Sequence, residues 1–410
     1  MIINKTKWNQ VELHPTTLKQ FKAGHHLVIK DQYTDRFPDD SIFLKTAQIS
    51  LKKIYYTLQD SSHPKVKARL WKILPYETEH LPNIDFYDEL AKRIAISVDK
   101  RKRLGLLENR NNFYLIFGEQ DQLPGLHVQL LGDIVLVQYY AFYWSQLEQS
   151  MYKALHQAIK QFFPELKIKD YIRQSRNPDK KSVYSSLKNK NIEPTTIEEF
   201  GVKFKIKFNE HYDIGIYSDM SALRGEIIKK LKPESHFLNL FSYTGAFSLQ
   251  AAKKKIYTTS VDLSKKFLDW SEENRALNPD ITEDYLENIC GDALKVTSKF
   301  VQEKRVFDSI LMDPPSFSSN KKKGSNALDS YKSFLPLFDK ILSNDGSLFI
   351  FLNNHSEKRK KFEETIEGII KNNRLNLKIN KKFKLIDDCK LNFPYPEADY
   401  LKGFELIRNK

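Results

Sequence analysis

The feature that most constrains the fold is an alternation of apolar segments with helix-like stretches, which begins at residue 201. The apolar segments read HFLNLF, YTTSVDL, FDSILMD and GSLFIFL. A strand that is apolar along nearly its whole length is buried on both faces, which is typical of a parallel sheet covered by helices. Residues 201–410 therefore predict an α/β domain built on an open parallel sheet.

The charge balance points to a polyanionic partner. The chain has 66 Lys and Arg residues against 52 Asp and Glu residues, which gives a net charge of +14. A net positive field attracts polyanions and speeds their encounter, so nucleic acid leads the expected partners. A lysine-rich surface that is merely solvated is the alternative.

The cysteine pattern and the apolar runs bear on metals and location. The two cysteines, Cys290 and Cys389, form neither a metal-ligand spacing nor a disulfide framework, so no metal is expected. The N-terminal stretch MIINKTKWNQ lacks the apolar core of a signal peptide, and the longest apolar runs are strand-length. We expect a soluble protein of the reducing cytoplasm, with no membrane partner.

The first 200 residues show two further patterns. Residues 1–75 carry short apolar runs between polar turn clusters, which predicts a small β-rich module. Residues 80–200 combine strand-like runs with an amphipathic helix. Its apolar residues recur at spacings of three and four: Leu147, Met151, Leu155, Ile159 and Phe162. We expect an α+β middle domain there, with residues 173–194 as a basic linker or an RNA-facing loop.

Ligands of an open parallel sheet bind at the carboxyl ends of its strands, so site residues are expected there. Polar or small residues follow each predicted strand: Ser242, Thr244, Gly245, Asp262, Asp292 and Asp313. The single glycine after strand 236–241 is not the G-x-G-x-x-G dinucleotide fingerprint. Asp262 can accept hydrogen bonds from two ribose hydroxyls, and Asp292 can accept one from an adenine amine.

Each aspartate alone has a simpler explanation, because Asp262 or Asp292 can cap the helix that follows it. Their order on consecutive strands of one sheet is harder to explain by capping. Together they are typical of the S-adenosylmethionine site of a class I methyltransferase.

The quoted motifs also carry a family resemblance. FLNLFSYTGAFSLQAA, VDLSKKFLDWSEENRALN, GDAL and FDSILMDPPSFSSNKK resemble segments of the large-subunit ribosomal RNA methyltransferases across residues 201–410. That group includes cytosine-C5 enzymes with an N-terminal PUA domain (RlmI-like) and the guanine-N7 half of the bifunctional RlmKL protein. The segment FGEQDQLPGLHVQLLGD is similar to a family segment that has Asp in place of Gln129.

The resemblance implies a three-part chain. Residues 1–75 would be a PUA-like RNA-binding module, residues 80–200 a middle domain, and residues 201–410 a Rossmann-like methyltransferase domain. The implied cofactor is S-adenosylmethionine, and the implied partner is 23S ribosomal RNA, free or as an assembly intermediate.

The resemblance also implies roles for single residues. Asp262 would hold the ribose, Asp292 the adenine amine, and the Phe241–Gly245 loop the methionine end. The full cofactor-binding set that it implies is Asp219, Arg224, Asn239, Phe241, Ser242, Thr244, Gly245, Asp262, Leu263, Asp292, Ala293 and Asp313.

The methylated atom is inferred from the cysteines. Carbon 5 of cytosine is not nucleophilic, so its methylation needs a cysteine thiolate. The cytosine-C5 relatives carry that cysteine after the strand that reads GSLFIFL here, where this chain has Asn353 and Asn354. Cys290 is expected beside the adenine and Cys389 within a C-terminal strand pair, and a free cysteine is usually a small hydrophobe.

The guanine-N7 half of RlmKL carries an Asn-Asn pair at this strand end, and the N7 lone pair needs no covalent activation. We therefore expect methyl transfer to guanine N7 without a cysteine intermediate. Amide side chains can donate and accept across a purine edge. Turn chemistry after the strand is the alternative explanation for the two asparagines.

The segment DPPSF at 313–317 is common to base methyltransferases of this class. Its prolines fix the backbone after Asp313, and Phe317 is expected to stack on an extruded base. The expected catalytic set is Asp313, Pro314, Phe317, Asn353 and Asn354. Phosphates of the RNA are expected at Lys321, Lys322 and Lys323. A solvated loop is the alternative for the lysines.

Several rival functions are weighed against this expectation. A nicotinamide oxidoreductase would need the glycine triplet, which is missing. The sequence leaves three further functions open: a cytosine-C5 rRNA methyltransferase, a catalytically inactive RNA-binding assembly factor, and a methyltransferase for protein or small molecules.

Overall fold

The computed structural model describes residues 6–60, 63–76, 84–175, 183–187, 191–209, 213–315, 327–355, 357–392 and 395–409. The chain divides into two compact units. Unit 1 consists of Met1–Thr195, Phe208–Tyr212 and Asp388–Ala398. Unit 2 consists of Thr196–Lys207, Asp213–Asp387 and Asp399–Lys410. The expected three-part division stays a prediction.

The first sheet of unit 1 lies in the N-terminal residues. Its strands, in spatial order, are β1 (Asn9–Gln10), β3 (Phe43–Gln48), β4 (Lys53–Gln59), β5 (Val66–Pro75) and β2 (Leu27–Ile29). Helix α1 (Pro15–Lys22) follows His14, whose ring accepts a hydrogen bond from the Thr16 amide. Leu18 and Phe21 of α1 join a small core with Tyr55 of β4.

The second sheet of unit 1 has the order β10 (Val183–Ser186), β9 (Asp170–Ser175), β8 (Ile134–Tyr139), β7 (Leu126–Leu131) and β6 (Asn112–Phe117). Helices α2 (Phe86–Arg103) and α3 (Glu148–Phe162) pack against each other and share its core. The amphipathic helix expected from the sequence is confirmed, because Met151, Leu155 and Ile159 of α3 are buried.

Part of the segment expected to be a linker is instead part of this sheet. Strand β10 pairs antiparallel with β9, and the Tyr184 side chain of β10 is buried. The buried Gln174 amide of β9 donates a hydrogen bond to the Tyr184 hydroxyl. The linker interpretation was therefore wrong for residues 173–175 of β9 and 183–186 of β10, because the buried Gln174 and Tyr184 side chains were concealed by the polar composition.

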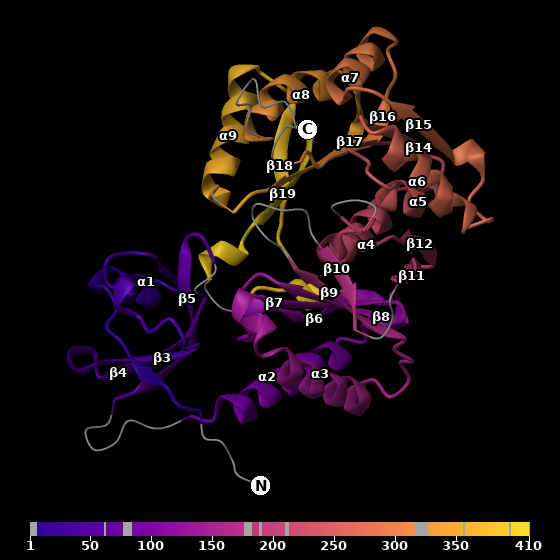
Figure 1. Cartoon of the computed structure of the whole chain (residues 1–410). Coiled ribbons are helices and arrows are strands. Elements are labelled where there is room, and N and C mark those ends of the chain that lie inside the picture. The colour runs from indigo at the N-terminus through magenta and orange to yellow at the C-terminus, as the bar shows by residue number, and fades with distance from the viewer. Residues whose placement is uncertain are drawn as a thin grey trace. The chain divides into compact units, whose positions relative to one another are not determined.

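Unit 2 is built on a seven-stranded sheet (Figure 1). Its spatial order is β15 (Leu286–Cys290), β14 (Tyr257–Asp262), β13 (His236–Leu240), β16 (Phe307–Met312), β17 (Leu342–Asn353), β19 (Leu401–Arg408) and β18 (Leu377–Phe383). Pairing is parallel from β15 to β17, and β19 runs antiparallel to both of its neighbours. The parallel sheet expected from the apolar segments is confirmed.

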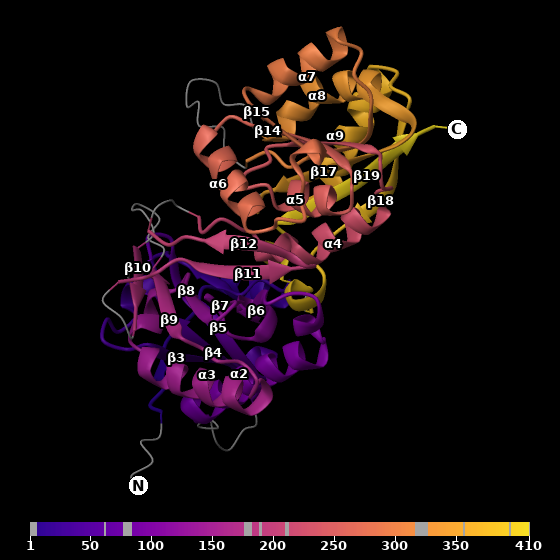
Figure 2. The same cartoon turned by 90° about the vertical axis from the view of Figure 1, so that its right-hand side faces the viewer.

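Helices cover both faces of this sheet (Figure 2). One layer holds α4 (Ser221–Lys230), α5 (Ala246–Lys253) and α6 (Lys265–Ala276), together with the ribbon β11 (Thr195–Glu199) and β12 (Val202–Ile206). The other layer holds α7 (Ala293–Gln302), α8 (Ala327–Ile341) and α9 (Arg359–Asn372). This double cover explains why the strands are apolar along their whole length.

The segment around Cys389 departs from its expected place. Cys389 was expected in the C-terminal strand pair, but it lies in a 3-10 turn, Asp387–Cys389, outside β18 and β19. That expectation was wrong, because the Asp388 carboxylate is hydrogen-bonded to Arg110 and to the Tyr114 amide in unit 1. In the described part of the chain, none of the helices combines the length and apolar character that crossing a membrane requires.

Candidate active site

The strand order of unit 2 defines where a ligand should bind. Strand β13 pairs with β14 on one side and with β16 on the other, so the chain winds in opposite directions from this point. In such sheets the crevice lies at the carboxyl ends of the two strands that flank the reversal. We call this the carboxyl edge of the sheet. It brings together the loop after β13, Asp262 at the end of β14 and Asp313 after β16.

The loop after β13 has an unusual backbone. Phe241 and Tyr243 adopt φ values of 58° and 52°, in the left-handed region that residues with side chains rarely occupy. Gly245 follows with φ 80°, and a Cβ atom added there would lie 2.2 Å from Ser271 Oγ. Such conformations persist only where surrounding contacts hold them, and they cluster at ligand sites. The loop is therefore pre-shaped.

Asp262 holds that loop from the next strand. Its carboxylate accepts hydrogen bonds from the Tyr243 amide (2.9 Å) and from the Ser264 amide (2.8 Å). Burial raises the pKa of Asp262, while these amides oppose the rise. Each carboxylate oxygen has a second lone pair that can accept a ligand hydroxyl. Beside it, Leu263 is 69% exposed and presents an apolar surface at the same edge.

Asp292 caps the helix that follows it, which was the simpler explanation of this residue. Its side chain accepts a hydrogen bond from the Lys295 amide at 3.0 Å and so caps helix α7. Asp292 is exposed, whereas Ala293, the next residue, is buried. Cys290 is exposed, with its Sγ atom 3.6 Å from the Leu263 carbonyl oxygen. The contact of Asp292 with the adenine amine stays a prediction. It would use the carboxylate oxygen that does not cap α7.

Two polar residues of the expected set face inward instead of toward the carboxyl edge. The Asn239 amide of β13 is buried and donates to Ser248 Oγ at 2.9 Å, which ties the strand to helix α5. The Thr244 hydroxyl is buried and donates to the Gly215 carbonyl at 2.5 Å. Both side chains hold the loop and the helix in place, and their direct contacts with a cofactor stay predictions.

Ser242 differs from these two residues. Its hydroxyl oxygen is buried and has no hydrogen-bond partner among the residues that the structure describes. A buried hydroxyl without a partner is costly, and it identifies a place where a ligand group would be accommodated. The orphan hydroxyl lies in the same strained loop that Asp262 holds. The carboxyl edge therefore fits a polar, nucleoside-containing cofactor.

Asp313 has the most perturbed carboxyl group at this edge. The Asp313 side chain is partly buried, and the pKa of its carboxyl group is raised to about 7. Burial is the main cause, the nearby Asp219 carboxylate adds to the rise, and the Arg224 charge opposes it. A carboxyl group that titrates near neutral pH within a cleft is a candidate for a functional group. Pro314, the next residue, is buried.

Asp219 and Arg224 are both engaged by other protein groups. The Tyr400 hydroxyl donates to Asp219 Oδ2 at 2.5 Å. The Arg224 guanidinium pairs with the buried Glu199 carboxylate through Nε–Oε1 (2.6 Å) and Nη2–Oε2 (3.1 Å). A bidentate pair of this kind is rigid, so the charge of Arg224 is fixed in place near Asp313. Direct contacts of Asp219 and Arg224 with a cofactor stay predictions.

Asn353 is the last residue of strand β17, beside β19, and Asn354 follows it. The Asn354 backbone amide donates to the Tyr400 carbonyl at 2.9 Å, and Lys402 Nζ donates to the Asn354 carbonyl at 2.5 Å. The His355 ring packs on the Tyr400 ring with centroids 5.1 Å apart. The expected residues Phe317, Lys321, Lys322 and Lys323 lie outside the described residues.

Tyr400 and His355 were missed by reasoning from the sequence. They meet the predicted site because β19 pairs antiparallel with β17, which places Leu401 opposite Asn353. No local spacing reports a pairing between segments so far apart in the chain. The aromatic residue directly before the last apolar run, in EADYLKGF, was the one available signal.

Residues 122–367 match the family model of the S-adenosylmethionine-dependent methyltransferases. The chain belongs to this family. Its cofactor is therefore S-adenosylmethionine. The strained loop after β13, the Ser242 hydroxyl and the Asp262 carboxylate fit this cofactor.

Known relatives agree with this assignment. The chain is 27% identical over 354 residues to ribosomal RNA large subunit methyltransferase I of Vibrio cholerae, covering 84% of this chain and 85% of that protein. It is 26% identical to the enzyme of the same name from Erwinia tasmaniensis, covering 84% and 85%. The expected resemblance to large-subunit rRNA methyltransferases is confirmed.

The fold is shared with SMU.776, a methyltransferase that was solved in complex with SAH (S-adenosylhomocysteine). The two structures align with a TM-score of 0.79 and 22% identity, covering 97% of this chain and 99% of that one. The expected class I methyltransferase fold is confirmed by this likeness. The PUA-like nature of residues 1–75 stays a prediction.

Proposed function

We propose that this methyltransferase modifies a base of 23S ribosomal RNA, and that the methylated atom is guanine N7. Two observations support ribosomal RNA as the substrate. The relatives of Vibrio cholerae and Erwinia tasmaniensis carry that substrate in their names, and their similarity extends over 84% of this chain. The net charge of +14 favours a polyanion over a protein or a small molecule.

The position of the cysteines carries the proposal for the acceptor atom. Cys290 ends β15, which stands four places from β17 in the strand order of the sheet. At about 4.8 Å between neighbouring strands, this separation is roughly 19 Å, too far to attack a base held beside Asp313 and Asn353. Cys389 belongs to unit 1 and is buried, so its thiol is not accessible to a base. Both placements argue against the covalent route to carbon 5 of cytosine.

Transfer to guanine N7 needs less from the protein. S-adenosylmethionine would supply an electrophilic methyl group, and the N7 lone pair would form the new bond to it as the bond from the methyl group to the sulfonium sulfur breaks. No proton is lost, and the guanine ring gains the positive charge. An ionised Asp313 would stabilise that charge. The amides of Asn353 and Asn354 would donate to O6 beside N7, so the protein acts mainly by positioning the base.

Other regions extend the proposal to RNA binding. Residues 1–75 would act as the PUA-like module and residues 80–200 as the middle domain that presents RNA to residues 201–410. Lys321, Lys322 and Lys323 would contact phosphates beside the target, and Phe317 would stack on the base. Ribosomal RNA as substrate also makes the cytoplasm the expected location.

The experiment that tests the proposal is nucleoside mass spectrometry. Undermodified ribosomal RNA is incubated with the purified protein and isotopically labelled S-adenosylmethionine, and is then digested to nucleosides. We expect label in 7-methylguanosine. Label in 5-methylcytidine would overturn the acceptor atom and revive a cysteine mechanism. Cofactor binding without label in any nucleoside would overturn RNA methylation and favour an assembly factor or another acceptor.

A further inference from the structure

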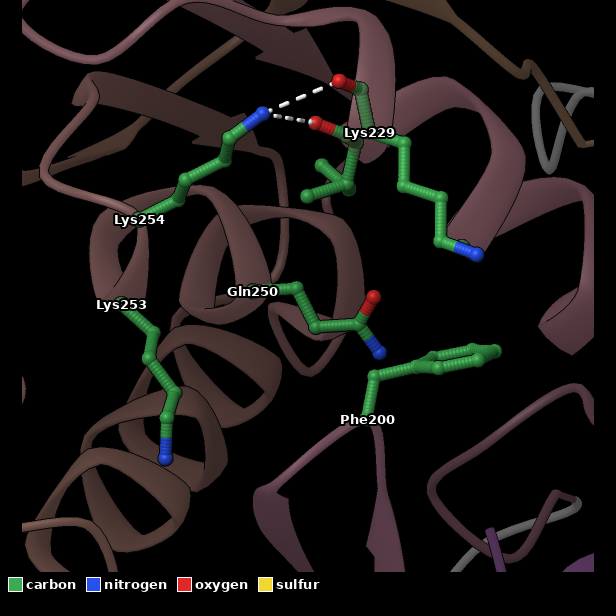
Figure 3. Close-up of a pocket in the computed structure, with 7 residues that line it drawn as sticks. Phe200, Lys229, Gln250, Lys253 and Lys254 are labelled. Carbon is green, nitrogen blue, oxygen red and sulfur yellow. Dashed lines mark hydrogen bonds between the residues drawn. The ribbon is translucent and has the colours of Figure 1, made fainter. Parts of the chain in front are cut away.

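A pocket of about 340 Å³ lies in unit 2, away from the carboxyl edge (Figure 3). It is lined by Phe200, Gly225, Ile228, Lys229, Gln250, Lys253 and Lys254. These residues belong to the turn between β11 and β12 and to the C-terminal parts of α4 and α5. Both helices lead into the amino ends of β13 and β14. The pocket therefore opens toward the amino ends of the strands, whereas Asp313 lies at their carboxyl ends.

The floor of the pocket contains a buried acceptor. Gln250 is 4% exposed, and its Nε2 atom donates to Glu199 Oε1 at 2.8 Å. A carboxylate oxygen only accepts, which fixes the orientation of the amide. The Gln250 Oε1 atom is buried and has no partner among the described residues. Figure 3 shows the Gln250 amide with its nitrogen on the side of Phe200 and its oxygen turned away from Phe200. This acceptor would be satisfied by a ligand N–H or O–H group.

Phe200 forms an apolar wall of the pocket. Its ring packs directly on Gly225 of α4, where an added Cβ atom would lie 2.6 Å from the Phe200 Cζ atom. Only glycine permits this approach, so the ring position depends on Gly225. The side chain of Phe200 is partly exposed, and its backbone has a positive φ of 50°. A partly exposed aromatic ring in a pocket offers a stacking surface for a planar heterocycle.

The rim of the pocket is positively charged. The Lys254 ammonium donates to the last carbonyl groups of α4, and the Lys253 ammonium lies 3.0 Å from Asp280 Oδ2. Lys229 is exposed, and its ammonium group meets no acceptor within the described ranges. Because Lys229 contributes an uncompensated charge, the ligand that complements this rim is anionic.

We propose that this pocket binds one unpaired nucleotide of the substrate RNA. The base stacks on Phe200, a base N–H group donates to Gln250 Oε1, and the phosphate meets Lys229. The inference rests on the proposed function, since it takes the RNA substrate from it. Because the pocket opens at the opposite ends of the strands from Asp313, the bound nucleotide holds the RNA strand in place and takes no part in the reaction. A free mononucleotide carries the same chemical groups, so the test separates the two sources.

The test measures binding of a short fluorescein-labelled oligoadenylate to the full-length protein by anisotropy. We expect Phe200→Ala to weaken binding about tenfold, because it removes one stacking surface. Lys229→Gln should reduce the slope of log affinity against log salt by about one, because one phosphate contact is lost. Lys371→Gln is the matched control, since Lys371 is an exposed lysine in the last turn of α9.

The outcomes separate this proposal from the proposed function. The proposal is overturned if both pocket variants bind the oligoadenylate with unchanged affinity. It is also overturned if their affinity and salt dependence change only as much as those of Lys371→Gln. Tighter binding of adenosine monophosphate than of the oligomer overturns RNA as its occupant. If the wild-type protein methylates ribosomal RNA while the pocket variants bind normally, the pocket fails and the function stands. Cofactor binding by each variant reports that it is folded.

Discussion

At the scale of single residues, Asp313 combines the strongest evidence of a functional role. Its pKa is raised to about 7 by burial and by the Asp219 carboxylate. The carboxylate form therefore becomes the major form only above neutral pH. Because guanine N7 gains positive charge during transfer, the ionised form is the active one. We predict that the methylation rate of the wild-type protein rises with pH through about 7 and then levels off.

Asp313→Asn tests this prediction, since the amide has the same shape and no charge. We expect the rate to fall about a hundredfold at pH 8, as for the loss of one preorganised electrostatic contact, and to become independent of pH near 7. Single-turnover methylation rates, measured at saturating cofactor between about pH 5.5 and pH 9, check this prediction. This range brackets the Asp313 pKa of about 7. An unchanged pH profile in Asp313→Asn would assign the titration to another group.

The same pKa has a consequence for stability. A carboxyl group whose pKa is raised in the folded state is held there in its protonated form. The free energy of unfolding therefore falls as pH rises from about 4 to about 7. Asp313→Asn removes that loss. We expect the variant to be more stable than the wild type at pH 8, by at most about 4 kcal/mol, and nearly equal to it at pH 4. Urea unfolding at both pH values measures the difference. Equal differences at both pH values would contradict the prediction.

The cysteines give a further prediction at this scale. We expect the double variant Cys290→Ser with Cys389→Ser to keep its methylation rate within about threefold, because neither thiol takes part in a covalent step. Cys389 is buried, so a modest loss of stability is expected and is followed separately by thermal unfolding. A double variant that binds the cofactor but transfers no methyl group would restore the cytosine-C5 mechanism.

At the scale of elements, the junction of β13 with α5 depends on Gly245. The residue has φ 80°, and a Cβ atom would clash with Ser271 Oγ at 2.2 Å. We predict that Gly245→Ala costs about 1–3 kcal/mol of stability and weakens cofactor binding, because the strained loop must shift. Equilibrium unfolding and calorimetric titration with S-adenosylmethionine measure the two effects.

Gly368 provides the matched control for that variant. It lies within α9, and a Cβ atom added there meets no atom within 4 Å. Gly368→Ala should therefore stabilise the protein by about 0.5–1 kcal/mol and leave cofactor binding unchanged. If both glycine variants shifted stability in the same direction, the steric account of Gly245 would be wrong.

The elements also show what a sequence can predict. The strand ends at Asp262 and Asp313 were predictable, because apolar strands buried on both faces have clear limits. The contact of Tyr400 with Asp219 was not predictable, because it depends on the antiparallel pairing of β19 with β17. Capping by Asp292 was one of two explanations that the sequence left open, and the geometry of α7 supports it. Local pattern thus predicts the strand ends, and distant pairing decides which residues join them.

At the scale of the whole molecule, the C-terminal part of the chain completes unit 1. Segment Asp388–Ala398 belongs to unit 1 although the residues on either side of it belong to unit 2. The Asp388 backbone carbonyl accepts a hydrogen bond from Arg101 Nη2 at 2.7 Å, deep within unit 1. No local pattern indicates that this segment belongs to unit 1, since DDCKLNFPYPEA has the composition of an ordinary polar connection. The folding of unit 1 is therefore linked to segment Asp388–Ala398.

Asp388→Ala measures the strength of this link. Asp388 is 2% exposed, and its carboxylate accepts from Arg110 Nη2 at 2.6 Å and from the Tyr114 amide at 2.7 Å. Removing it takes away the carboxylate that pairs with the buried Arg110 guanidinium, so we expect a loss of about 3–5 kcal/mol in urea unfolding. Faster hydrogen exchange at the Tyr114 amide should accompany the loss, because that amide loses its acceptor.

The control for that variant is Glu165→Ala, which removes an exposed ion pair with Lys102 in the same unit. An exposed pair contributes at most about 1 kcal/mol, so this variant should unfold almost as the wild type does. Similar losses of unfolding free energy in the two variants would mean that segment Asp388–Ala398 contributes little to the stability of unit 1. A large loss in Asp388→Ala alone would mean that unit 1 reaches full stability only with segment Asp388–Ala398 in place.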